Sequence, residues 1–231
     1  MKKRSDKSIL LYEAAKKEFY DNGYNDTIFS NITHRCGAQK SAITYYFGTK
    51  AHLAHLIMSE YVNKITDISR KYLIQDKDCD DLLVAIAVDH YVWLTSLAVD
   101  EKHKRFMLEA YSAAEHRAYN EVAVEHIKEL RDRYNIPLNH ASREVEMISI
   151  TNQGAYKALM VEYFSGSLPI PLETMADFKI RNLLRMLYFD DDKIDETLEK
   201  SKKLFKGMQL HYGPYFELRL QKCPKLNNGQ Q

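Results

Sequence analysis

Four polar side chains that can hydrogen-bond with the edges of nucleic-acid bases are grouped within six residues of the chain. They are Gln39, Lys40, Ser41 and Thr44. A lysine can donate to O6 and N7 of guanine, and a glutamine can pair with adenine through two hydrogen bonds. These four residues are therefore candidate readers of DNA bases, provided that the surrounding elements can place them in a groove.

The sequence contains no motif for enzymatic chemistry. No glycine-rich phosphate loop, nucleophile elbow or spaced carboxylate pair occurs, so we predict that the protein is not an enzyme and needs no cofactor. His52 and His55 have the spacing of two metal ligands on one helical face, but HExxH is absent and no third ligand is evident. No metal site is predicted. Cys36, Cys79 and Cys223 form no CxxC pair and are expected to be reduced thiols of a cytoplasmic protein.

Helices must position the candidate base readers, because the composition is typical of a helical protein. Only 8 Gly and 5 Pro occur among 231 residues, which is few for a chain of many short strands. Apolar residues recur at helical spacing from about 7 to 22, and Gly23 lies where such a helix ends. Three further helices are predicted over about 28–35, 39–46 and 50–73.

The remainder of the chain is also predicted to be helical, and no segment alternates long enough to predict a strand. Candidate helices cover about 80–99, 101–114, 117–134, 142–165, 172–189 and 194–208. The longest uninterrupted apolar run, residues 82–88, is too short to span a membrane. The basic N-terminus is not followed by the apolar segment of an export signal. We predict an all-α protein with a three-helix DNA-binding domain over 1–55 and a second helical domain over 56–231.

Charge is distributed unevenly along the chain, although the net charge is only +1. Residues 1–55 contain nine Lys and Arg against five Asp and Glu, whereas the remainder contains 24 against 27. A basic head on a mildly acidic body is expected if only the head touches phosphates. Lys2, Lys3, Arg4 and Lys7 could form an arm on the DNA backbone or be a solvated terminus.

The two helices predicted around residue 37 have the form of a helix-turn-helix, whose second helix enters the major groove of DNA. Each is about eight residues long, and Gly37 provides the tolerance of positive φ that the sharp turn needs. Ile32 on the first helix and Ile43 on the second would pack against Phe19. The turn and the packing therefore support an N-terminal DNA-binding unit.

Residues 9–57 resemble the DNA-binding domain of the tetracycline-repressor (TetR) family of bacterial transcription regulators. The resemblance is carried by Ala14, Ala15, Phe19, Gly23, Tyr24, Thr27, Ile32, Gly37, Ile43, Tyr45, Tyr46, Phe47, Lys50 and Leu53. It implies a homodimeric repressor that binds a palindromic double-stranded DNA operator and is released by a small-molecule effector. The sequence departs from the family at Gln39, where a serine or threonine usually caps the recognition helix, and at Thr44, where tyrosine is common.

The resemblance also assigns roles to residues around the helix-turn-helix. The expected DNA contacts are Gln39, Lys40, Ser41, Thr44, Tyr45, Tyr46, Lys50 and Thr27. Lys40 could read a base or contact a phosphate, whereas Tyr45, Tyr46 and Lys50 resemble the phosphate contacts of the family. One of the two tyrosines is expected to belong to the core instead.

An effector pocket is implied in the body, where large amphipathic side chains are frequent. The candidate lining residues are His90, Tyr91, Trp93, Met107, Tyr111, Tyr119, Tyr156 and Met160. Such a pocket would suit a planar or amphipathic small molecule. The alternative is that these side chains only pack in the core.

Apolar residues on the predicted helices 142–165 and 172–189 suggest a dimer face. On the first helix the stripe comprises Ile148, Ala155, Leu159 and Glu162, and on the second it comprises Ala176, Ile180, Leu183 and Leu187. Stripes of this kind are typical of a four-helix bundle made by two subunits. The competing interpretation is that 172–189 is a core helix within one subunit.

Two other functions remain open at this point. The protein could be a DNA-bound scaffold whose body recruits another protein without a ligand pocket, which predicts a filled interior and an exposed apolar patch. It could also be a helical-bundle enzyme with an accidental match in the head, which would need converging titratable groups. The repressor predicts an internal cavity.

Overall fold

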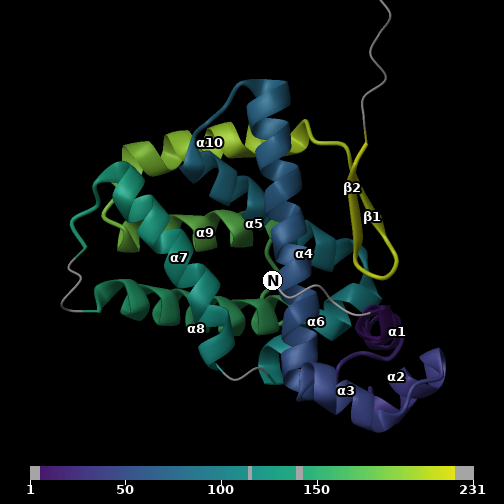
Figure 1. Cartoon of the computed structure of the whole chain (residues 1–231). Coiled ribbons are helices and arrows are strands. Elements are labelled where there is room, and N and C mark those ends of the chain that lie inside the picture. The colour runs from purple at the N-terminus through teal and green to yellow at the C-terminus, as the bar shows by residue number, and fades with distance from the viewer. Residues whose placement is uncertain (1–5, 114–115, 139–142, 222–231) are drawn as a thin grey trace, which may run out of the picture.

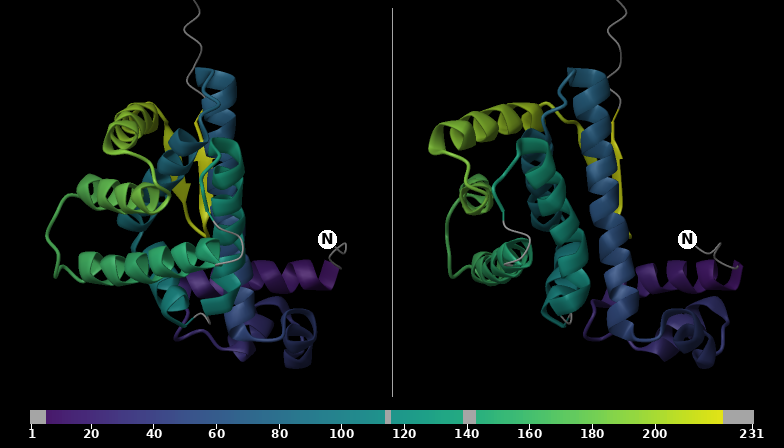
Figure 2. Two further views of the ribbon diagram at one scale, coloured as in Figure 1. Left: turned by 90° about the vertical axis from the view of Figure 1, so that its left-hand side faces the viewer. Right: turned by 60° about the vertical axis from the view of Figure 1, so that its left-hand side comes forward.

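The computed structural model describes residues 6–113, 116–138 and 143–221, apart from the side chains of 76 and 116–123. Within this part of the chain there are ten α-helices, one turn of π-helix and a single two-stranded sheet (Figure 1). The predicted all-α class is confirmed in its main feature. Three helices form a head at one end of a long helix, and the remaining helices form a body along the side of that helix (Figure 2).

The head comprises α1 (Asp6–Asn22), α2 (Phe29–Cys36) and α3 (Lys40–Phe47), close to the predicted ranges. The long helix α4 (Lys50–Lys71) follows directly, and the hydroxyl of Thr49 caps it by accepting a hydrogen bond of 3.1 Å from the backbone N–H of His52. One π-helical turn, η1 (Tyr72–Asp76), extends it. The proposed domain boundary after residue 55 therefore lies inside a continuous helix that joins head and body.

The body is built around α5 (Leu82–Val99), which is apolar on nearly all sides. The other body helices are α6 (Glu101–Ala113), α7 (His116–Tyr134), α8 (Glu144–Phe164), α9 (Leu172–Met186) and α10 (Asp191–Lys206). By length and composition α5 is the one helix of the described chain that could cross a membrane, but 67% of it is buried inside the protein. Because α5 packs against α4, α6, α9 and α10, it is a core helix.

A C-terminal β-hairpin corrects the prediction that the chain contains no strand. Strand β1 (Leu210–Gly213) pairs in antiparallel fashion with β2 (Glu217–Leu220). In the connecting turn, Tyr215 and Phe216 have positive φ angles of 57° and 62°. This backbone is unfavourable for aromatic residues. Burial of the Phe216 ring stabilises the turn, since this ring lies 5.0 Å from the ring of Phe106 on α6 and 5.6 Å from that of Tyr20 on α1.

The apolar stripe on α9 lies inside the protomer, which corrects its assignment to a dimer face. Ala176, Ile180, Leu183 and Leu187 are buried, and α9 packs against α5, α8 and α10 of the same chain. The intramolecular interpretation therefore holds for this helix. On α8 the result is divided, because Ile148 is buried whereas Ala155 and Glu162 are exposed.

Candidate DNA-binding surface and cavity

The two faces of α3 differ completely in burial. Ala42, Ile43 and Phe47 are buried in the head core, with the ring of Phe47 6.2 Å from that of Tyr12 on α1. The candidate base readers Gln39, Lys40, Ser41 and Thr44 are all exposed on one side of the helix. The core contacts of α3 therefore present these four side chains together to solvent, as a recognition helix requires.

Both tyrosines of α3 belong to the exposed surface. The exposed fractions are 82% for Tyr45 and 37% for Tyr46, and the two rings meet edge to face with centroids 5.0 Å apart. The expectation that one of them fills the core is wrong, because Ile43 and Phe47 already occupy that space. Both hydroxyls thus lie beside the base readers, where they could contact phosphates.

The start of α3 shows how the sequence builds the helix-turn-helix. Gly37 has φ +66°, and no atom lies within 4 Å of the position that a β-carbon would take. Its role is therefore conformational, since a side chain would fit but the backbone would be strained. Gln39 occupies the N-cap position and makes no capping hydrogen bond with its side chain.

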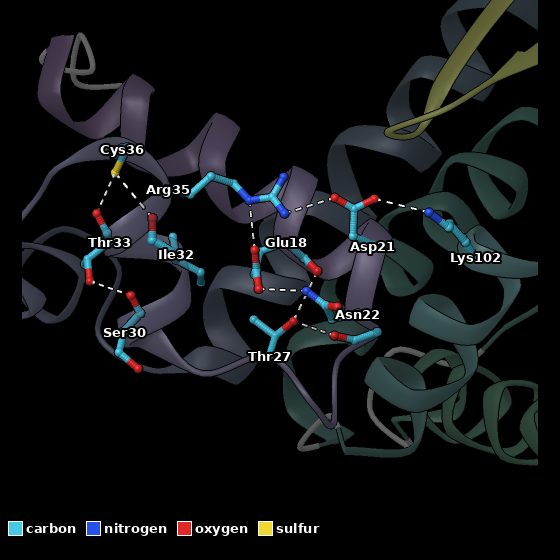
Figure 3. Close-up of polar contacts among 11 residues, drawn as sticks. Glu18, Asp21, Asn22, Thr27, Ser30, Ile32, Thr33, Arg35, Cys36 and Lys102 are labelled. Atoms are coloured by element: carbon cyan, nitrogen blue, oxygen red, sulfur yellow. Dashed lines mark hydrogen bonds and ion pairs between the residues drawn. The ribbon is translucent and has the colours of Figure 1, made fainter.

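A buried carboxylate fixes α2 against α1 (Figure 3). Glu18 on α1 is buried and accepts hydrogen bonds from Arg35 Nε at 2.8 Å and from Asn22 Nδ2 at 2.7 Å. The same guanidinium reaches Asp21 at 3.0 Å. Because the charge of Glu18 is paired and hydrogen-bonded, its burial holds the last turn of α2 in place. Sequence reasoning missed this network, because Arg35 lies 17 residues from Glu18 along the chain.

Two of the predicted DNA contacts have structural roles within the head. Thr27 is completely buried, and its hydroxyl donates to the carbonyl oxygens of Gly23 at 2.6 Å and Glu18 at 3.3 Å. Thr27 therefore lies outside the exposed surface that carries the candidate base readers. Lys50 Nζ donates to the carbonyls of Tyr24 at 2.9 Å and Thr27 at 3.0 Å, and lies 4.4 Å from the centre of the Tyr24 ring. Its ammonium group thus anchors the α1–α2 loop. The candidate arm residues Lys2, Lys3 and Arg4 lie outside the described residues.

The head is fastened to the body through α6. Lys102 reaches Asp21 at 3.3 Å, the end of the network in Figure 3. Three residues further along, the guanidinium of Arg105 donates to the backbone carbonyl of Asp21 at 2.6 Å. Glu109 accepts the backbone N–H of Asn25 at 2.8 Å. The α1–α2 segment that carries the helix-turn-helix is therefore held to the same helix at three points.

A cavity of about 180 Å³ lies in the body. The lining residues are His55, Met58, Ser59, Val62, Asn63, Ile65, Thr66, Ile86, Asp89, His90, Trp93, Tyr111, His126, Gln153, Tyr156 and Lys179. They come from every helix between α4 and α9, and α4 supplies the largest share. A cavity with mainly apolar walls and a few convergent polar groups has the form of a small-molecule site.

The predicted pocket residues divide into two groups. His90, Trp93, Tyr111 and Tyr156 line the cavity. Met107 and Met160 do not, because they are packed in the core, and Tyr91 faces α9, where its hydroxyl donates to Asp177 at 2.5 Å. Tyr119 lies in the part of α7 whose side chains fall outside the described residues.

Ionisable side chains converge in this cavity, which sequence reasoning did not foresee. Lys179 Nζ lies 2.9 Å and 3.0 Å from the two ring nitrogens of His90. Burial lowers the pKa of Lys179 to about 7, and burial next to this lysine lowers the pKa of His90 well below its ordinary value. Asp89 accepts a hydrogen bond of 2.9 Å from Thr66, and burial raises the pKa of its carboxyl to about 6.

The sequence does carry a signal for two of these groups. Lys179 interrupts the apolar stripe of α9 between Ala176 and Ile180, and Asp89 is the only Asp, Glu, Lys or Arg residue in α5. A charged residue on a buried helical face is rare unless it is paired or functional.

Among the described residues no cluster of three or more His, Cys, Asp or Glu side chains is arranged to hold a metal ion. His55 faces the cavity while His52 is exposed.

Comparison with known proteins agrees with this geometry. Residues 11–57, which comprise most of the head and the start of α4, match the model of the family described as bacterial regulatory proteins, tetR family. These residues therefore resemble the DNA-binding domain of that family, with α2 and α3 as its helix-turn-helix. No curated protein matches the chain in sequence.

Solved structures of TetR-type regulators share the fold across the body as well. The ligand-free structure of RolR is similar with a TM-score of 0.53 at 12% identity, over 83% of this chain and 96% of RolR. A TetR regulator from Rhodococcus sp. RHA1 has a TM-score of 0.53 at 15% identity, over 78% of this chain and 94% of that regulator. At these identities the likeness concerns the fold alone, so the cavity of this chain must be interpreted from its own residues.

We expect Lys50→Met to lower the free energy of unfolding of the protein by about 1–3 kcal/mol, because the loop carbonyls lose a charged donor. Urea unfolding would measure the effect, with Lys40→Met on exposed α3 as the control that leaves stability unchanged. Equal stability of the two variants would contradict the anchoring role of Lys50.

We expect Lys179→Met to raise stability by about 1–4 kcal/mol below pH 7, because it removes a buried charge without a charged partner. The folded-state pKa of about 7 lies below the ordinary value of 10.5. The unfolded chain therefore binds more protons between these values, and the penalty from Lys179 disappears as the pH rises through this window. Thermal unfolding at pH 6 and pH 9 would test this. A lower melting temperature of the variant at pH 6 would contradict it.

Proposed function

We propose that this protein is a homodimeric repressor that binds a palindromic operator through α3 and leaves it when a small molecule occupies the cavity. The observation that carries the proposal is the double role of α4. This helix begins three residues after the end of α3 and also forms much of the cavity wall. Whatever fills the cavity therefore presses on the helix that holds the recognition helix.

The DNA-facing part of the proposal rests on the exposed side of α3. Lys40 and Ser41 lie in its first turn, and the N-terminal residues of a recognition helix are the ones that contact base edges. Gln39 and Thr44 extend this row, while Tyr45 and Tyr46 stand beside it as phosphate contacts. The base readers and the phosphate contacts thus form one continuous surface.

Release by a ligand follows from the attachment of α4 to the head. The hydroxyl of Tyr12 on α1 donates to the carbonyl of Leu56 at 3.2 Å, and Lys16 pairs with Glu60 at 2.8 Å. Both contacts fall in the turns of α4 that also supply His55, Met58 and Ser59 to the cavity. A ligand that prefers a different position of α4 would shift the population away from the DNA-bound arrangement, by no more than its differential affinity.

Dimerisation is supported by an exposed apolar face on α8. Met147 and Ile150 are 54% and 56% exposed, and Val161 continues the face at helical spacing. Between them lie Gly154 and Ala158, which would permit close approach of a second helix. A contiguous apolar surface of this kind is typical of a protein interface. A two-fold axis there would have to set the two α3 helices about 34–36 Å apart for successive major grooves.

The scaffold alternative is less well supported because the body contains a cavity with convergent polar groups instead of a filled interior. These titratable groups could also be read as an enzyme site. We assign them to ligand recognition, because the cavity borders the helix that carries the DNA-binding head. A regulator of this type would act in the cytoplasm, where the DNA of a bacterium lies. Selection of an operator from random DNA, followed by a release screen with small molecules, tests the function directly.

We expect Lys40→Ala to weaken binding to the selected operator by about 1–3 kcal/mol and to relax discrimination at one base pair, because its position favours base contact. Fluorescence anisotropy on the operator and its single-base variants would measure both effects. Lys200→Ala on exposed α10 is the charge-matched control. An equal loss on all sequences, with the salt slope reduced by about one, would assign Lys40 to a phosphate instead.

We expect Ile150→Glu to convert the dimer to a monomer at micromolar concentration, because it places a charge in the centre of the apolar face of α8. Light scattering would measure the mass. Val99→Glu changes an equally exposed apolar residue at the end of α5 and should leave the mass unchanged. A wild-type monomer, or a dimer that tolerates Ile150→Glu, would remove α8 from the interface.

A further inference from the structure

We propose that the cavity recognises a small organic acid, and that Lys179 is the counter-ion for its carboxylate. This inference rests on the proposed role of the cavity as the effector site and names the chemical class of the effector. It starts from a buried cation that lacks an anion. Lys179 is only 6% exposed and lines the cavity from α9.

The surroundings of Lys179 are polar and aromatic but not acidic. Its Nζ contacts the His90 ring and lies 4.0 Å from the centre of the Tyr156 ring. Among the described residues no carboxylate forms an ion pair with it. The nearest acidic residue along α9, Asp177, instead accepts from Tyr91 at 2.5 Å and from Lys202 at 2.9 Å. Asp177 is therefore bonded to other groups, and the ammonium group of Lys179 lies beside the cavity without an acidic partner among the described residues.

A purely structural lysine would be expected to behave differently. Lysine side chains normally extend their ammonium group to solvent or pair it with an acid, because an isolated buried charge is strongly unfavourable. Lys179 does neither. Its position is explained if a ligand supplies the missing negative charge, since a bound carboxylate would stabilise the protonated amine that burial alone disfavours.

The neighbouring groups are compatible with an anion at this wall. His90 is neutral, because burial next to Lys179 lowers its pKa well below the ordinary value, so it can accept a hydrogen bond from the ammonium group. The buried hydroxyl of Tyr156 interacts with Trp93, whose indole N–H can only donate, so the hydroxyl proton could be donated to a carboxylate. The hydroxyl of Tyr111, by contrast, already donates a hydrogen bond of 2.5 Å to Gln153 Oε1.

A carboxylate elsewhere in the cavity wall limits the orientation of the ligand. Asp89 on α5 is bonded to Thr66 of α4 and would repel a carboxylate, so the charge belongs at the α9 side. His126 from α7, whose pKa is lowered by burial, and His55 from α4 complete the titratable groups that face the cavity. Met58, Ile65 and Ile86 supply apolar surface for the body of the ligand.

The size of the cavity limits the ligand further. A cavity of about 150 Å³ lined by apolar side chains can hold benzene, and this one measures about 180 Å³. Trp93 and the tyrosines in its wall offer aromatic faces. A single aromatic ring with one carboxylate therefore fits both the volume and the chemistry.

The test compares acids with their neutral amides on the full-length protein. Benzoate, phenylacetate and 1-naphthoate, each beside its carboxamide, would be titrated by calorimetry and by the fluorescence of Trp93, the single tryptophan. We expect at least one acid to bind about tenfold or more tightly than its amide, as a hydrogen-bonded charge pair allows. At pH 8, binding should also take up a proton, which calorimetry in buffers of different ionisation enthalpy measures.

Two variants locate the effect. Lys179→Met should lower acid binding to the level of the amide and abolish proton uptake, while thermal unfolding checks that the variant is folded. Lys203→Met removes an exposed ammonium group on α10, outside the cavity, and should bind like the wild type. An acid preference that survives Lys179→Met, equal binding of acids and amides, or failure of every acid to bind would each overturn the proposal.

A separate assay of operator release keeps this inference distinct from the proposed function. An acid that binds through Lys179 but leaves the operator complex intact would support the anion site and contradict release by this cavity. Release by a neutral molecule, with no acid preference, would support the repressor function and overturn the anion site.

Discussion

The packing of Phe19 against Phe106 is the contact on which the arrangement of head and body depends. Phe19 is completely buried and stacks on Tyr24 within the head at 6.0 Å, while its ring lies 5.1 Å from that of Phe106 on α6. One apolar core therefore runs from the helix-turn-helix into the body. Such aromatic pairs contribute about 0.5–1.5 kcal/mol beyond the burial of their area. Because the core is continuous, the head cannot turn freely on α4, and its orientation must follow the position of α6.

This joint gives the cavity two mechanical routes to the recognition helix. The first is α4, which forms the cavity wall and leads back to α3. The second is α6, which contributes Tyr111 to the cavity, Phe106 to the joint and Glu109 to the α1–α2 loop. The β-hairpin contacts the same joint between head and body, since Phe216 packs on Phe106 and on Tyr20. Close-packed contacts of this kind tend to shift between discrete arrangements instead of deforming gradually. Small displacements at the cavity can therefore become a change in head orientation.

The parts of the structure that could be predicted from sequence are those with local causes. Gly37 marks the sharp turn, and apolar periodicity defines α1 to α4. The hairpin was missed because its strands have only four residues and its turn contains Tyr215 and Phe216 in place of the usual glycine or asparagine. The stripe on α9 was assigned to the wrong partner, since periodicity reveals that a face is buried but not whether it packs within or between subunits. In the cavity, His90 and Trp93 were foreseen from residue type, whereas convergence with Lys179 depends on tertiary packing.

If the cavity is the effector site that we propose, its ionisable groups act as recognition elements and not as part of the core. In the ligand-free protein the buried lysine and Asp89 are both destabilising, because burial shifts each pKa toward the neutral form. Apolar residues at both positions would give a more stable body. The desolvation of these groups occurs when the protein folds, before any ligand arrives, so a ligand with complementary charge gains the full interaction in an already ordered site. A neutral ligand of the same shape gains only apolar contact. On the proposed assignment, the instability retained at Lys179 would provide selectivity for an anion, beside the two helices that hold the head.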